Sequence, residues 1–147
     1  MIKRSILIVM GLLLLVPLAY AKKPPIFATA EGAIRGHDPV AYFTAGKPVK
    51  GDKQYSFEWS GSKWYFASAD NRDRFKANPE KYAPQFGGYC AYAVSRGYTA
   101  TTVPEAWTIV DDKLYLNYSL GVRQRWQRDI GGNIAKANKN WPGVLNE

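Results

Sequence analysis

The hydrophobic pattern begins with one apolar run and then changes to short alternating segments. Residues 6–18 are almost all apolar, with Lys3 and Arg4 before them and a small-x-small triplet ending at Ala21 after them. A charged start, an apolar middle and such a triplet are typical of a secretory signal peptide, and the run is shorter than a membrane span needs. We therefore expect residues 1–21 to be cleaved and the protein to be periplasmic or secreted; an uncleaved N-terminal anchor is the alternative.

The remaining chain, residues 22–147, has the length of a single domain. Aromatic and polar residues alternate over 54–59, which is typical of a half-buried strand, and 64–66 would return beside it after a glycine turn. Segments 107–110 and 114–117 predict a second hairpin in the same way.

Helical patterns occupy most of the rest. Ser68 is placed to cap a helix that ends near Ala77, and Ser119 is placed to cap another. Beyond Ser119, apolar residues recur every three or four positions as far as Trp141, with a break or kink expected at the glycines 131–132. These elements predict an α+β fold: a small single domain with two β-hairpins packed against several short helices and C-terminal amphipathic helices.

The composition favours an aromatic core and a dispersed positive charge. Phe, Trp and Tyr make up 14% of the chain, and the formal net charge of +8 falls to +6 when Lys3 and Arg4 leave with the signal peptide. Because the cations lie on predicted helix faces, we read them as solvated and expect no nucleic-acid partner. Weak association with an anionic membrane surface remains open.

A lone cysteine is the first candidate site. Cys90 has no partner for an intramolecular disulfide, which is notable for an exported protein. It lies near the start of a short helix predicted within 89–94, where free N–H groups would favour the thiolate. The alternative is a buried cysteine that packs as a small hydrophobic residue between Tyr89 and Tyr92.

The only histidine, His37, stands beside Asp38. Together with Cys90, these side chains would suit copper or zinc, although a structural zinc site usually has four ligands. The alternative is a loop histidine, with Asp38 making a turn before a proline. A catalytic Cys–His pair would also need an orienting group, for which Asp38 and Asn117 are candidates that the sequence does not place, so we predict no catalytic residue.

Four segments together resemble the YHS domain family. The resemblance covers about 33–120 and is closest to an exported, stand-alone branch with a Gly-Gly-Tyr-Cys-Ala segment. It implies a small α+β module for binding or sensing. The segments that carry it are 36–43, 61–68, 75–82 and 87–91.

A metal-linked branch of that family carries cysteines that this chain lacks. Ala41 and Ala67 stand where those cysteines would be, so the resemblance transfers no paired-thiolate metal site.

Three hypotheses follow for the function. The first is binding of a copper or zinc ion, through Cys90, His37 and Asp38, or of a small ligand beside Cys90 with Tyr89 and Tyr92 as walls. The second is a thiol-based redox or sensor protein that uses Cys90. The third is a structural or interaction module without small-molecule chemistry.

Overall fold

The structure is a computed structural model that describes residues 22–147, so the predicted signal peptide lies outside the described residues. Within these residues, three antiparallel hairpins and six short α-helices confirm the predicted α+β class. The strands are β1 (Ala28–Thr29), β2 (Gly32–Ala33), β3 (Asp52–Trp59), β4 (Ser62–Phe66), β5 (Trp107–Val110) and β6 (Lys113–Leu116). The helices are α1 (Pro39–Thr44), α2 (Ala69–Ala77), α3 (Pro79–Tyr82), α4 (Ala91–Ser95), α5 (Leu120–Gln127) and α6 (Ile130–Asn140).

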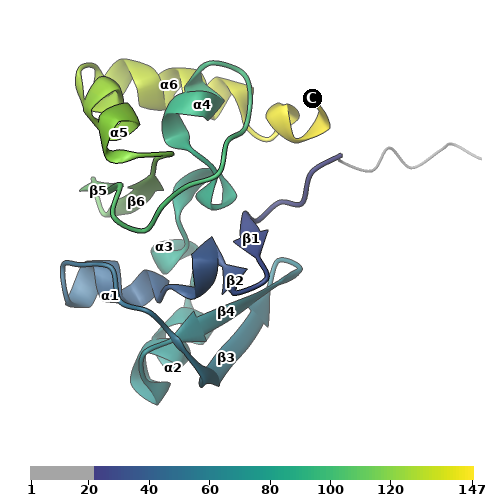
Figure 1. Ribbon diagram of the computed structural model, residues 1–147, viewed down its shortest axis with the longest axis vertical. Helices are drawn as coiled ribbons and strands as arrows, with labels where there is room; N and C mark the ends of the chain where they lie inside the picture. Colours follow the sequence, from purple (N-terminus) through teal and green to yellow (C-terminus); the bar gives the residue numbers. More distant parts are fainter. Residues whose placement is uncertain (1–21) are drawn as a thin grey trace, which may run out of the picture.

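The elements form two groups, one above the other in Figure 1. The lower group holds β1 to β4 with α1 and α2, and the upper group holds β5, β6 and α4 to α6. A 3-10 segment, η2 (Gln85–Gly88), lies between α3 and α4 in the chain. Among residues 22–147, no helix is long and apolar enough to cross a membrane.

Both predicted hairpins are confirmed. In β3, Tyr55, Phe57 and Trp59 are half-buried while the residues between them are exposed, as the alternation indicated. Phe57 pairs with Trp64 across the β3–β4 hairpin. The ribbon of β1 and β2 was not predicted, because strands of two residues are too short to show a period.

The structure has two hydrophobic cores, and β6 contributes to both: Leu114 and Leu116 to the lower core, Tyr115 to the upper core. In the lower core, the ring of Phe75 lies 5.1 Å from the ring of Trp64 and 5.2 Å from that of Phe66. In the upper core, the ring of Tyr115 lies 5.4 Å from that of the fully buried Trp126. Fully burying one such ring stabilises the fold by about 1.5–3 kcal/mol, so these aromatic clusters account for much of the stability.

The helix caps agree with the sequence, but the C-terminal break does not fall where predicted. The hydroxyls of Ser68 and Ser119 cap α2 and α5. The expected break at 131–132 is wrong, because the chain leaves the helix at Asp129 and both glycines lie inside α6. The Asp129 carboxylate accepts the N–H of Gly132 at 3.1 Å and starts a new helix there.

The buried carboxylate of Asp38 connects the segments of the lower group. Its Oδ1 accepts the N–H groups of Val40 at 2.8 Å and Ala41 at 3.3 Å, which caps α1. Its Oδ2 accepts the Ala67 N–H and the Asn71 side-chain amide, both at 2.8 Å. One fully buried side chain therefore joins α1 to the end of β4 and to α2.

We predict that Asp38→Ala lowers the free energy of unfolding by about 3 kcal/mol, because it removes a helix cap and leaves buried donors without partners. Chemical denaturation checks this. Asp73→Ala is the matched control, because Asp73 is an exposed acid whose loss should change stability by less than about 0.5 kcal/mol. Equal stability of Asp38→Ala and the parent protein would contradict the role assigned to Asp38.

Candidate functional site

A pocket of about 270 Å³ opens in the upper group beside Cys90. Its lining residues come from α4, from α5 and from the loops beside them; Figure 1 labels both helices. Most of its walls are apolar or aromatic, which is typical of sites for small organic ligands. We call it the Cys90 pocket; its lining residues are Cys90, Tyr92, Ala93, Tyr98, Ala100, Tyr118, Val122 and Arg125.

The thiol of Cys90 is buried, with only 1% of the residue exposed. Its Sγ accepts the N–H of Tyr118 at 3.3 Å and lies 3.5 Å from the side-chain oxygen of Asn117, to which the thiol donates. Burial raises the pKa of Cys90, and nearby backbone N–H groups oppose this only in part. Of the two alternatives for Cys90, the structure favours the buried, protonated thiol over the activated thiolate.

Asn117, which the sequence offered only as a possible orienting group, lies directly beside Cys90. Its Oδ1 also accepts the backbone N–H of Tyr92 at 3.1 Å, which ties the end of β6 to the start of α4. The residue is fully buried, and its amide nitrogen has no hydrogen-bond partner among residues 22–147. The position of Cys90 is therefore fixed by a neutral amide.

The two tyrosines predicted as walls behave differently. Tyr92 lines the Cys90 pocket, whereas Tyr89 is not among its lining residues. The ring of Tyr89 lies 5.9 Å from that of Phe27 in the upper core, and its hydroxyl donates to the carbonyl of Pro24 at 2.8 Å. Burial raises the pKa of Tyr89.

The outer walls come from Tyr98 and Tyr118, which sequence reasoning missed. They are 51% and 53% exposed, large fractions for aromatic side chains. Neither shows a helical or strand period, because each lies in a loop, so only their types could have pointed to them.

The remaining predicted ligands, His37 and Asp38, make other contacts. Nδ1 of His37 lies 3.2 Å from the carbonyl oxygen of Arg35, and both oxygens of Asp38 accept the hydrogen bonds described above. Within 22–147, no group of three or more His, Cys, Asp or Glu side chains is arranged to hold a metal ion. The donors present do not fit a copper or zinc site, and metal ligation by Cys90, His37 and Asp38 stays a prediction without geometric support.

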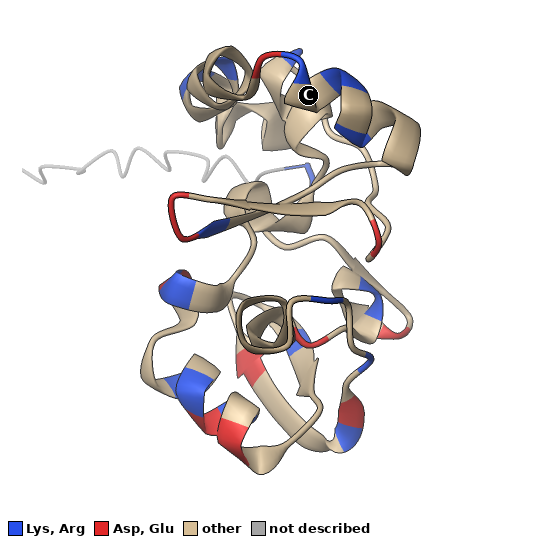
Figure 2. Cartoon of the chain, turned by 90° about the vertical axis from the view of Figure 1, so that its left-hand side faces the viewer, with Lys and Arg blue, Asp and Glu red and all other residues tan. Residues whose placement is uncertain are grey.

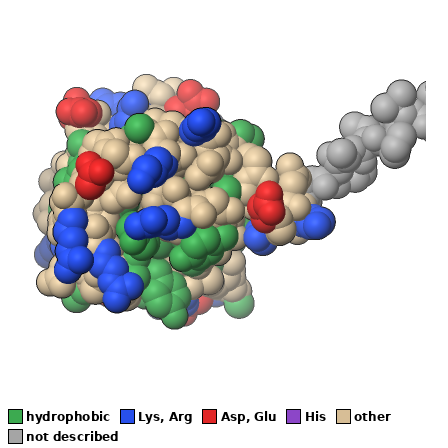
Figure 3. Space-filling view, turned by 90° about the horizontal axis from the view of Figure 1, so that it is seen from above, with side chains coloured by type: hydrophobic (Ala, Val, Ile, Leu, Met, Phe, Trp, Pro, Cys, Tyr) green, Lys and Arg blue, Asp and Glu red, His purple; other side chains and the backbone are tan. Residues whose placement is uncertain are grey.

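A second, basic pocket of about 260 Å³ adjoins the Cys90 pocket and shares Tyr92 and Arg125 with it. Among the charged residues, Lys and Arg predominate on the upper helices, whereas α2 carries both positive and negative side chains (Figure 2). Seen from above, cationic side chains border a hydrophobic patch on this face (Figure 3). The basic pocket is lined by Tyr92, Arg96, Arg125, Arg128, Asp129, Asn133 and Lys136.

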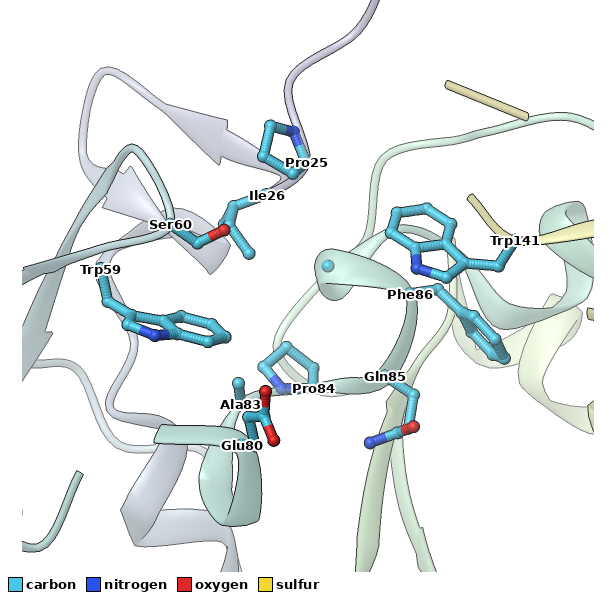
Figure 4. A pocket seen from close by; sticks show the side chains of 11 residues that line it. Pro25, Ile26, Trp59, Ser60, Glu80, Ala83, Pro84, Gln85, Phe86 and Trp141 are labelled. Carbon is cyan, nitrogen blue, oxygen red and sulfur yellow. The ribbon is translucent and has the colours of Figure 1, made fainter. Parts of the chain in front are cut away.

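A larger cleft of about 490 Å³ lies elsewhere, at the seam between the two cores (Figure 4). Trp59 of the lower core and Trp141 of the upper core stand on opposite sides of it. The chain is tightly packed at Gly87, which lines this cleft: its φ is +62°, and a Cβ there would overlap the carbonyl of Pro25. None of the residues predicted from the sequence as site residues lines this cleft.

Comparison with known proteins identifies one family. The model of the YHS domain matches residues 40–86, from α1 to the start of η2. No curated protein and no solved structure matches the chain. The Cys90 pocket lies just beyond the matched residues. The resemblance read from the sequence is therefore confirmed at residues 40–86, the segment that matches the model of the YHS domain.

Proposed function

We propose that this protein is a small-ligand-binding module whose ligand enters the Cys90 pocket. The observation that carries the proposal is the pocket itself, with three tyrosines and aliphatic side chains around one buried thiol. Apolar pockets with a few fixed polar groups are the usual form of small-molecule sites. Binding would cover apolar surface that Tyr98 and Tyr118 leave exposed to water.

The buried thiol gives the redox hypothesis less support than the ligand hypothesis. Oxidation and disulfide exchange require an accessible thiolate. Cys90 is 1% exposed and its pKa is raised by burial. Its contribution to the pocket is an apolar surface held in place by Asn117 and Tyr118.

Export belongs to this proposal as well. The charged start, apolar run and small-x-small triplet of residues 1–21 support delivery to the periplasm or the outside. A free cysteine is protected there when it is buried, as Cys90 is. The ligand would then be encountered outside the cytoplasm.

The burial of Cys90 predicts slow alkylation of the folded protein. We expect iodoacetamide near pH 8 to modify Cys90 about a hundredfold more slowly in native protein than in guanidinium, because local opening by about 3 kcal/mol must precede reaction. Mass spectrometry measures the rate. The control is Thr101→Cys in a Cys90→Ser background, since Thr101 is exposed. A native Cys90 that reacts as fast as the control thiol would favour the redox hypothesis.

The proposal predicts that filling the pocket weakens ligand binding. Val122→Trp places a large ring in the lining of the Cys90 pocket, and we expect it to weaken binding of the neutral probe 2-naphthol at least about tenfold, a loss of about 1.4 kcal/mol. Calorimetric titration measures this. Gln124→Trp puts the same ring on an exposed position of α5 and should bind like the parent. Equal binding by parent and Val122→Trp would remove the pocket as the site.

A further inference from the structure

We infer that the ligand is an anionic amphiphile, with its apolar body in the Cys90 pocket and a carboxylate, sulfonate or phosphate group in the basic pocket. This inference rests on the proposed function, because it assigns the chemistry of the molecule that the Cys90 pocket receives. Three features of the upper face carry it: the junction of the two pockets, the unpaired charge, and the side chains that are held at the junction.

The two pockets meet along one face of α5. Val122 and Arg125 are three residues apart, which places them on neighbouring turns of the same helix face. Val122 lines only the Cys90 pocket, whereas Arg125 lines both pockets. A ligand that follows this face therefore passes from an apolar wall to a guanidinium group within one helical turn.

The basic pocket holds more positive than negative charge. Four cations line it, Arg96, Arg125, Arg128 and Lys136, and none of them forms a salt bridge within residues 22–147. The single acid in its lining, Asp129, is engaged as the cap of α6. Like charges that face one hollow repel each other, and a bound anion would remove part of that repulsion.

Direct contacts hold the shared wall in place. The guanidinium of Arg96 lies over the ring of Tyr92, with its carbon 5.0 Å from the ring centre, and it donates to the Tyr92 hydroxyl at 2.9 Å. Asn133 is buried, and its amide donates to the carbonyl of Trp126 at 2.9 Å. Because a guanidinium presents a planar fork of donors, Arg96 and Arg125 suit a carboxylate, sulfonate or phosphate group better than a lysine would.

The apolar half excludes a simple inorganic anion as the natural ligand. Such an ion would satisfy the cations but leave the exposed rings of Tyr98 and Tyr118 without an apolar contact in the Cys90 pocket. A neutral apolar molecule would have the opposite fault, since it would leave the four cations without a counter-charge. Only a ligand with both parts matches both pockets.

The test compares two probes that share one body, neutral 2-naphthol and anionic 2-naphthalenesulfonate, by calorimetric titration against residues 22–147. We expect the sulfonate to bind about tenfold more tightly, in line with one charge-assisted hydrogen bond. Raising the salt concentration from about 0.05 M to about 0.5 M should weaken the binding of the sulfonate but not of 2-naphthol, because salt screens only the interaction of the charged probe.

Matched variants locate the effect. Arg128→Gln should lower the affinity for the sulfonate about tenfold and leave the affinity for 2-naphthol unchanged, because Arg128 lines only the basic pocket. Lys139→Gln removes the same charge from an exposed position of α6 outside both pockets and should bind both probes like the parent. Thermal unfolding of each variant confirms that it is folded. If Arg128→Gln does not fold, Lys136→Gln replaces it, because Lys136 also lines only the basic pocket.

The outcomes separate this inference from the proposed function. Equal binding of the two probes, or no effect of Arg128→Gln on binding of the sulfonate, would overturn the anionic assignment and keep a neutral ligand. Sulfate alone that binds as tightly as the sulfonate would also overturn it, because the apolar pocket would then add nothing. Binding of phosphatidylglycerol vesicles without binding of either soluble probe would assign the face to a membrane surface and overturn both proposals.

Discussion

The hydrogen bonds of the buried residue Asn117 connect three segments of the upper group around Cys90. Its side-chain oxygen accepts the N–H of Tyr92 and lies 3.5 Å from the sulfur of Cys90, which joins α4 to the end of β6. Its backbone N–H donates to Ala106 and its carbonyl accepts from Val103, which adds the loop before β5. In a low-dielectric interior these bonds are stronger than in water, so the pocket is shaped before any ligand arrives.

The family match and the site lie in different parts of the molecule. Residues 40–86 build α1 to α3 and the β3–β4 hairpin, which surround the lower core and the Asp38 carboxylate. The Cys90 pocket and the basic pocket are made by α4 to α6 and the loops around them. The two pockets therefore lie in the part of the chain beyond the matched domain, and the match to the YHS domain by itself does not specify the ligand.

Local patterns predicted most of the fold and little of the site. Alternation in β3 and the capping hydroxyls of Ser68 and Ser119 depend on near neighbours, so they are visible in the sequence. Two other features depend on three-dimensional contacts that hydrophobic periodicity does not reveal. These are the start of α6 at the Asp129 cap and the position of Arg125 in the wall of the basic pocket. Cys90 was recognised as a candidate, but the rise of its pKa follows from burial, which only tertiary packing establishes.

The most direct test of the central claim is a map of where a ligand binds. Titration of isotope-labelled protein with 2-naphthalenesulfonate, followed by NMR, should shift the amide signals of α4, of the loop after it and of α5. Amide signals near Trp59 and Trp141, which line the larger cleft between the two cores, should stay unchanged. Shifts confined to that cleft, or no shifts at all, would contradict the account that the Cys90 pocket is the binding site.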